Sequence, residues 1–173
     1  MTDRTSYADL LRPGCFIKTA HGKIGKVLDD NTVRFEMDTR ASIPSFGESL
    51  TSYKIKNTWY TDPVMEVRYP TKSFDLPSNY WFFDRMTIVW TRNEFIKEIL
   101  DPGDIIIYKS EPYVYVQDYS ETMISLIDGM SSVMPVHSID KGKVSAVYRP
   151  RYWIDYKDYD TESRLIFKKE ADQ

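Results

Sequence analysis

The chain carries an approximate internal repeat, which limits the possible folds more than any other feature. Residues 11–17 read LRPGCFI and residues 100–106 read LDPGDII, an offset of 89. The matches continue at this offset or with one or two inserted residues: Ile24 with Tyr113, Val27 with Val116, Thr32 with Thr122, and Ile43-Pro44 with Met134-Pro135. Such self-similarity indicates a duplicated structural unit. Because barrels of about 60 residues can fold alone, we predict two modules, residues 1–91 and 92–173.

Each repeat is predicted to open with a short helix that ends at a Pro-Gly turn. Thr91 and Glu94 have the Thr-x-x-Glu spacing of a helix capping box ahead of the apolar residues that end at Leu100. Residues 6–11 precede the first Pro-Gly in the same way. Proline cannot continue a helix, and glycine tolerates the positive φ of a tight turn. We therefore expect a helical turn, a Pro-Gly turn and then strands in each module.

Short β-strands follow both turns. In residues 32–37, apolar and charged side chains alternate, which is the pattern of a strand with one buried face. The strands predicted after the two turns are 15–19, 23–28 and 32–37, then 104–108, 113–118 and 123–127. Extended segments at 52–60, 64–69 and 80–90 give the first module extra strands or an inserted hairpin, and 143–148, 152–156 and 164–168 complete the second. Strands at about ten-residue spacing favour a meander that closes into a small barrel.

The composition favours a mainly β, soluble protein. The 13 Tyr, 8 Phe and 4 Trp suit a pleated, half-buried surface. Cys15 is the only cysteine, so no intramolecular disulfide can form, which favours a reducing, cytoplasmic location. The N-terminal residues lack the layout of a signal peptide and no apolar run approaches a membrane span of about 20 residues, so we expect no membrane contact. The formal charge of −3 excludes a chain coated in positive charge, so any nucleic-acid surface has to be local.

Residues 13–28, which read PGCFIKTAHGKIGKVL, resemble the KOW and Tudor-like group of SH3-like barrels. In that group, an opening strand with Pro-Gly or Gly-Asp is followed by a Gly-rich turn and a Gly-Lys-Val strand. The resemblance implies two SH3-like small barrels, each preceded by a short helix, of a kind that often contacts nucleic acid or a nucleoprotein partner in transcription and translation. At the same offset, the second module has Glu111, Pro112 and Val114 in place of two glycines and a lysine, so it is more Tudor-like than KOW-like.

Basic side chains gather in the first of these segments. Residues 12–26 contain one arginine, three lysines and one histidine and no acidic residue, and two further arginines follow closely. Cations near backbone amides bind phosphate without reading base sequence. The predicted nucleic-acid-binding residues are Arg12, Lys18, His21, Lys23, Lys26, Arg34 and Arg40. The competing interpretation is that they are ordinary solvated side chains on a small barrel.

Aromatic side chains gather in the second module. Exposed rings can form a cage for a cation, stack on bases or anchor a protein partner. The acidic residues near the end of this module would repel phosphate, which favours a basic protein partner. The predicted protein-binding residues are Tyr113, Tyr115, Tyr152, Trp153 and Tyr156. The competing interpretation is that alternating aromatics form the core and cross-strand pairs of a small sheet.

Signals for catalysis are weak. His21 and His137 are the only histidines, and neither has the spacing of paired metal ligands. A nucleophilic pair of Cys15 and His137 has no motif behind it. Phosphate-loop, dinucleotide-binding and hydrolase-elbow motifs are absent from the sequence. We therefore predict a binding protein that is not an enzyme and uses no metal or cofactor.

The sequence thus favours a tandem-barrel protein whose first module contacts nucleic acid or a nucleoprotein complex, while the second docks on a protein or on the first module. The main alternative is a protein-interaction module, such as an inhibitor or adaptor that uses exposed aromatic anchors. A third possibility is a small enzyme, which would require a pocket that gathers His21 or His137 with carboxylates.

Overall fold

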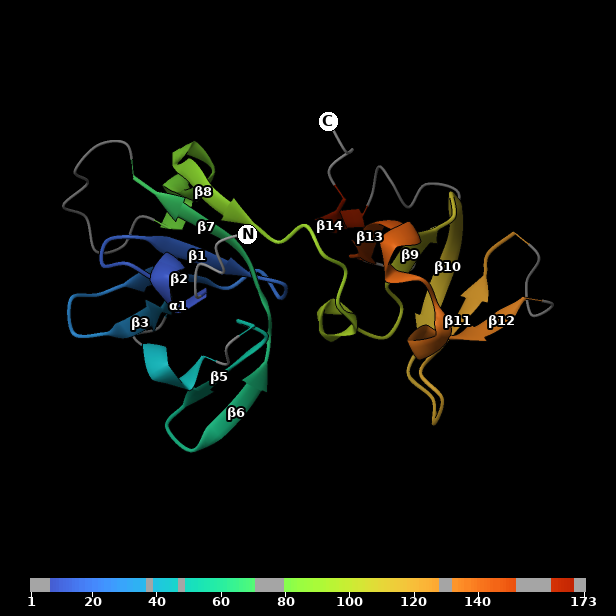
Figure 1. The fold of residues 1–173 in the computed structure, drawn as a ribbon, viewed down its shortest axis with the longest axis horizontal. Coiled ribbons are helices and arrows are strands. Elements are labelled where there is room, and N and C mark those ends of the chain that lie inside the picture. The colour runs from blue at the N-terminus through green and yellow to red at the C-terminus, as the bar shows by residue number, and fades with distance from the viewer. Residues whose placement is uncertain are drawn as a thin grey trace, which may run out of the picture. The chain divides into compact units, whose positions relative to one another are not determined.

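The structure, a computed structural model, describes residues 7–36, 39–46, 49–70, 80–127, 132–151 and 163–169. The chain divides into two compact units, Met1–Arg92 and Asn93–Gln173, a boundary one residue from the predicted one. Each unit is built around one antiparallel sheet (Figure 1), so the protein is mainly β. No helix in the described ranges has both the length and the apolar character needed to cross a membrane.

The first unit contains an eight-stranded sheet in the order β6-β5-β4-β3-β2-β1-β7-β8. Its elements are α1 (Tyr7–Leu10), β1 (Phe16–Thr19), β2 (Ile24–Val27), β3 (Thr32–Phe35), β4 (Arg40–Ser42), the 3-10 turn η2 (Ile43–Ser45), β5 (Ser52–Ile55), β6 (Thr58–Thr61), β7 (Val64–Tyr69), η3 (Tyr80–Arg85) and β8 (Thr87–Thr91). Segment 64–69 is a strand as predicted, whereas 52–60 is a hairpin that turns at Lys56, where φ is +54°. Segment 80–90 begins as a 3-10 helix before it becomes β8.

The second unit contains a six-stranded sheet in the order β12-β11-β10-β9-β13-β14. Its elements are η4 (Lys97–Ile99), β9 (Ile105–Tyr108), β10 (Glu111–Val116), β11 (Thr122–Ser125), β12 (Val133–Pro135), η6 (Val136–Ser138), η7 (Lys141–Lys143), β13 (Val144–Pro150) and β14 (Ser163–Lys168). The predicted strand 152–156 lies outside the described residues.

The predicted capping-box helix before the second Pro-Gly is wrong. Thr91 belongs to β8 and pairs with Glu66 of β7, so it cannot cap a helix. Ile96 is extended, and only the single turn η4 follows it. The Pro-Gly turns themselves are present in both units, because Gly14 and Gly103 have φ of +87° and +91°.

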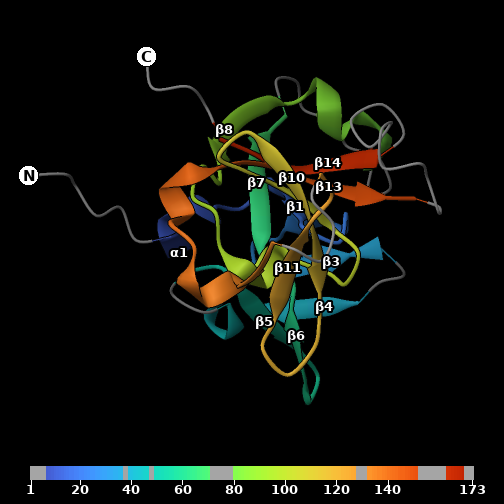
Figure 2. The same cartoon turned by 90° about the vertical axis from the view of Figure 1, so that its right-hand side faces the viewer.

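The two units share one topology. The order β4-β3-β2-β1-β7-β8 in the first corresponds to β12-β11-β10-β9-β13-β14 in the second. The strand next to the last is irregular at the same place in both, between Val67 and Arg68 and between Val147 and Tyr148. The first unit adds the hairpin β5–β6, which lies beside β4 (Figure 2). A duplicated sheet with one inserted hairpin therefore accounts for the repeat.

The structure also corrects how the repeat aligns. The amide of Gly14 donates to the Val27 carbonyl, and the amide of Gly103 donates to the Tyr115 carbonyl. Val27 therefore corresponds to Tyr115 and not to Val116. Similarly, the turn that follows β4 begins at Ile43 and the turn that follows β12 begins at Val136, so Met134-Pro135 match residues 41–42 instead of Ile43-Pro44.

One cross-strand pair in the core has an aromatic residue and a small residue in both units, but on opposite strands of the pair. Gly25 lies opposite Phe35 on neighbouring strands of the first sheet. The equivalent positions in the second sheet are Tyr113 and Ser125, which also lie opposite each other. All four are buried. Because cores are packed to a fixed density, each unit places one aromatic ring and one small residue at this point.

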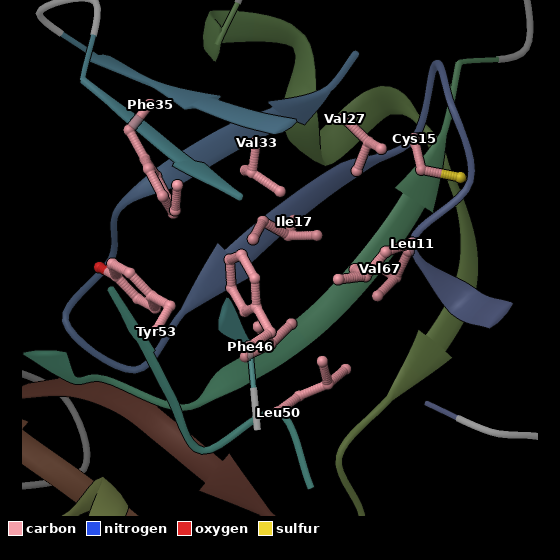
Figure 3. Packing of buried hydrophobic residues seen from close by; sticks show 12 residues of the cluster. Leu11, Cys15, Ile17, Val27, Val33, Phe35, Phe46, Leu50, Tyr53 and Val67 are labelled. Carbon is pink, nitrogen blue, oxygen red and sulfur yellow. The ribbon is translucent and has the colours of Figure 1, made fainter. Parts of the chain in front are cut away.

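The core of the first unit lies on one face of its sheet. The side chains of Ile17, Val27, Val33 and Val67 point toward one another from four neighbouring strands (Figure 3). Tyr53 of the added hairpin stacks on Phe35 with 5.0 Å between ring centroids, which ties the hairpin to this core. Alternation along each strand leaves the intervening side chains on the opposite face, called here the outer face.

Candidate nucleic-acid interface

Three of the predicted basic residues meet on the outer face of the first sheet. In register, Lys26 of β2 lies opposite Arg34 of β3, and Arg34 lies opposite Arg40 of β4. Adjacent strands are about 4.8 Å apart, so these three cations form a continuous line across the sheet. We call Lys26, Arg34 and Arg40 the cationic row.

The cationic row places like charges side by side, which destabilises a sheet. Asp30 offsets part of this repulsion, because its Oδ2 lies 3.5 Å from Nη1 of Arg40. Arg40 is exposed, and Lys26 and Arg34 are half-buried, so the row faces solvent. Its geometry suits an anion with several charges more than a single carboxylate.

Lys18 continues the outer face but is already engaged. Its Nζ lies 4.0 Å from Glu66 Oε1 and 5.7 Å from the centre of the Phe83 ring. Arg68, which the sequence analysis did not select, lies over the same ring at 4.7 Å and donates to Glu66 through Nη2 at 2.6 Å. Phe83 and its buried neighbour Phe16 form a small apolar cluster here. This end of the outer face is covered and internally neutralised.

His21 and Lys23 lie apart from the cationic row, in the turn between β1 and β2. His21 Nδ1 lies 2.7 Å from Oδ1 of the buried Asp62, and the His21 amide donates to the same oxygen at 3.0 Å. Tyr53 donates its hydroxyl proton to Oδ2 of Asp62 at 3.2 Å, and Lys23 donates to the Tyr53 hydroxyl at 3.3 Å. The network therefore joins this turn to the start of β7 and fixes the position of Lys23.

The charge of Asp62 is maintained by its partners. Burial by itself would raise the pKa of this carboxyl, but hydrogen bonds from the ring and amide of His21 and from Thr19 outweigh burial and lower the pKa. Burial, followed by the nearby Asp62 charge, raises the pKa of Tyr53, so its hydroxyl stays protonated and donates. Asp62 accepts hydrogen bonds from the turn and from the added hairpin, so it stabilises the position of both. Within the described ranges, no group of three His, Cys, Asp or Glu side chains could hold a metal ion.

Two exposed aromatic rings on β6 were missed by the sequence analysis. Trp59 and Tyr60 of β6 have 61% and 37% of their surfaces exposed. Lys54 Nζ lies 5.9 Å from the Trp59 ring centre, and Lys23 Nζ lies 4.8 Å from the Tyr60 ring centre. Two lysines followed closely by two aromatics in residues 54–60 were an available signal, because cations beside aromatic rings are typical of nucleic-acid surfaces.

Arg12 is the predicted residue that lies before the first strand. It is exposed, and its Nε donates to the Asp9 carbonyl at 3.0 Å, on the segment before β1. The seven predicted residues thus divide into the cationic row, the neighbouring Lys18, the turn with His21 and Lys23, and Arg12.

The second unit lacks the cationic row. The positions equivalent to its three residues are Val114, Ile124 and Val133, which lie opposite one another in the same register. Val133 is 51% exposed. The shared scaffold therefore carries cations in the first unit and β-branched apolar side chains in the second.

Two of the predicted aromatic anchors of the second unit, Tyr113 and Tyr115, are buried and do not face solvent. Tyr113 and Tyr115 are each only 6% exposed, because alternation along β10 directs both to the buried face. They are core residues in this structure. Tyr152, Trp153 and Tyr156 lie outside the described residues.

Cys15 has no features of a nucleophile. It is buried in the core of the first unit, and burial raises the pKa of its thiol. Its suggested partner His137 lies in the other compact unit.

Comparison with protein-family models, with curated proteins and with solved structures gave no match. Function is therefore inferred from the side chains themselves.

Proposed function

We propose that this protein binds nucleic acid through the outer face of its first unit, without catalysing a reaction. In this proposal the two curled sheets are SH3-like small barrels of the KOW and Tudor-like kind. The first contacts the phosphate backbone, alone or within a nucleoprotein complex in the cytoplasm. A protein that recognises the phosphate backbone shows little preference for base sequence, because the backbone is the same in every sequence.

The observation that carries this proposal is the cationic row. Lys26 with Arg34 and Arg34 with Arg40 are two cross-strand pairs of like charge, and like charges placed opposite each other in a sheet repel. A polyanion laid across the strands relieves that repulsion and releases its own counterions. The equivalent row in the second unit is apolar, so the cations are not a requirement of the scaffold.

The second unit is proposed to contact a protein. Val114, Ile124 and Val133 offer an apolar line where the first unit offers charge. Residues 92–173 also carry 15 acidic side chains against 11 basic ones, which disfavours phosphate and favours a basic partner.

The test replaces the cationic row by neutral residues in the full-length protein. The triple variant Lys26→Gln, Arg34→Gln, Arg40→Gln should bind a labelled oligonucleotide more weakly than wild type, with a similar loss for every base sequence. Removal of three phosphate contacts should lower the slope of log affinity against log salt by about 2 to 3. Fluorescence anisotropy between about 50 and 200 mM salt measures this slope.

The matched control removes the same number of charges from the second unit. Lys109, Lys141 and Lys143 are exposed, and their change to Gln should leave both affinity and salt slope near the wild-type values. Equal weakening by both triple variants would mean that net charge alone drives binding. Failure of the wild-type protein to bind any oligonucleotide at low salt would refute the proposal.

A further inference from the structure

The added hairpin β5–β6 is the part of the first unit that duplication does not explain. It has no counterpart strand in the second sheet. Every residue of β6 is exposed, including Trp59, whose side chain is 61% exposed. A tryptophan in water forgoes the burial of a large apolar surface. The core uses Tyr53 from this hairpin and not Trp59.

The hairpin holds the Trp59 ring in a defined place. Trp59 lies opposite Lys54 in the register of β5 and β6, and Lys54 Nζ lies 5.9 Å from its ring centre. The next residue, Tyr60, stacks on the buried Tyr53 with 5.8 Å between ring centroids. The backbone that carries Trp59 is therefore anchored to the core by the residue beside it.

Trp59 faces the same side of the sheet as the cationic row. Ala41 of β4 lies opposite Ile55 of β5, and Ala41 is part of the core. Alternation then directs Arg40 of β4 and Lys54 of β5 to the outer face, together with Trp59, the cross-strand partner of Lys54. From β6 to β3 is three strand spacings, about 14 Å. The line through Trp59 meets β3 at Thr32, two residues or about 7 Å along the strand from Arg34. A single strand of a few nucleotides can therefore touch both Trp59 and Arg34.

We infer that the first unit selects single-stranded nucleic acid, with a base stacked on Trp59 and the adjoining phosphates on the cationic row. This inference rests on the proposed function. Aromatic rings bind unpaired bases of any sequence, because every base has a π face. In a duplex the base faces are already covered by their neighbours, so the ring has nothing to stack on. Lys54, above Trp59, would contact the phosphate next to the stacked base.

The test compares full-length wild type and Trp59→Ala on a single-stranded 12-nucleotide oligo-dT and on the duplex of that oligonucleotide with oligo-dA. We expect wild type to prefer the single strand. We expect Trp59→Ala to lose about 5- to 150-fold in affinity for the single strand, and to bind the duplex as wild type does. Trp59→Phe keeps an aromatic face and should restore most of the single-strand affinity.

The matched control is Ile88→Ala, which removes another exposed apolar side chain, 55% exposed, from the strand at the opposite edge of the same sheet. It should leave both affinities unchanged. Equal binding of both probes by wild type, or an unchanged single-strand affinity in Trp59→Ala, would overturn the inference and leave the proposed function standing. If the wild-type protein bound neither the single strand nor the duplex, the proposed function itself would be refuted.

Discussion

Gly25 is a position where a single added methyl group would meet the packed core of the first unit. A Cβ at this residue would lie 2.6 Å from Cγ1 of Val33 and 3.0 Å from two carbons of the Phe35 ring. Both neighbours are buried, at 0% and 3% exposure, so neither can move into solvent. The change Gly25→Ala therefore overfills a closed part of the core.

The expected magnitude follows from two opposing effects. Overfilling a well-packed core costs about 1–3 kcal/mol. Alanine also narrows the conformational freedom of the unfolded chain, which returns about 0.4–1 kcal/mol. We therefore expect Gly25→Ala to lower the free energy of unfolding of the first unit by about 1–2 kcal/mol.

A second substitution distinguishes this clash from a backbone effect. Val33→Ala removes the Cγ1 atom that the new methyl group would meet, and by itself costs the free energy of the buried methyl groups plus that of a small cavity. In the double variant the new methyl group fills part of that cavity. The cost of the double variant should therefore be at least 1 kcal/mol smaller than the sum of the two single costs, a coupling typical of residues in contact, roughly 0.5–3 kcal/mol.

Hydrogen exchange of the amides of Ile17 and Val27 measures the opening of the first unit alone, even when the two units unfold separately. Urea denaturation of the full chain provides a second measure. An unchanged free energy in Gly25→Ala, or costs that simply add in the double variant, would show that the packing around Gly25 is not as described.

Two further predictions concern buried charges. Because the pKa of Asp62 is lowered in the folded protein, its ionised form adds stability above the ordinary pKa of about 4, and this contribution disappears as pH falls through the lowered pKa. The gap in unfolding free energy between wild type and Asp62→Asn should therefore shrink below about pH 4, and a gap constant from neutral to acid pH would contradict the network. In the second unit, Arg149 donates to both oxygens of the buried Asp104 at 2.9 and 2.8 Å, so Arg149→Tyr should cost about 3–5 kcal/mol. The residues equivalent to Asp104 and Arg149 in the first unit are Cys15 and Tyr69. The double variant Asp104→Cys, Arg149→Tyr, which copies that pair, should be more stable than the single variant in urea denaturation.

The first strands could be predicted from local pattern because alternation records burial directly. The strands containing Ile17, Val27 and Val33 were expected within one or two residues, and the mainly β fold was confirmed. The Pro-Gly turns were also predictable, because each requires a positive φ at its glycine. The capping-box prediction failed because Thr91 pairs with Glu66 in the sheet, a partner distant in sequence that local spacing does not reveal.

The presence of the repeat could be predicted from the sequence, but its residue-by-residue alignment could not. Matching letters equated Val27 with Val116, but the equivalent residue is Tyr115. The exchange of a Gly and Phe pair for a Tyr and Ser pair hides the correspondence, because each residue alone looks unrelated to its match. Packing requires one large and one small side chain at this point, and that requirement belongs to the cross-strand pair rather than to either position alone.

Local alternation was enough to predict which side chains of residues 32–37 turn away from the core, Arg34 among them. Matching segments were enough to predict a duplicated unit that opens with a Pro-Gly turn. Three features depend on the fold as a whole: Arg40 completes the cationic row, Trp59 is exposed on the same face of the sheet, and Tyr113 is buried. Strand register and burial depend on partners distant in sequence, so local pattern fixes the face of a residue but not its neighbours.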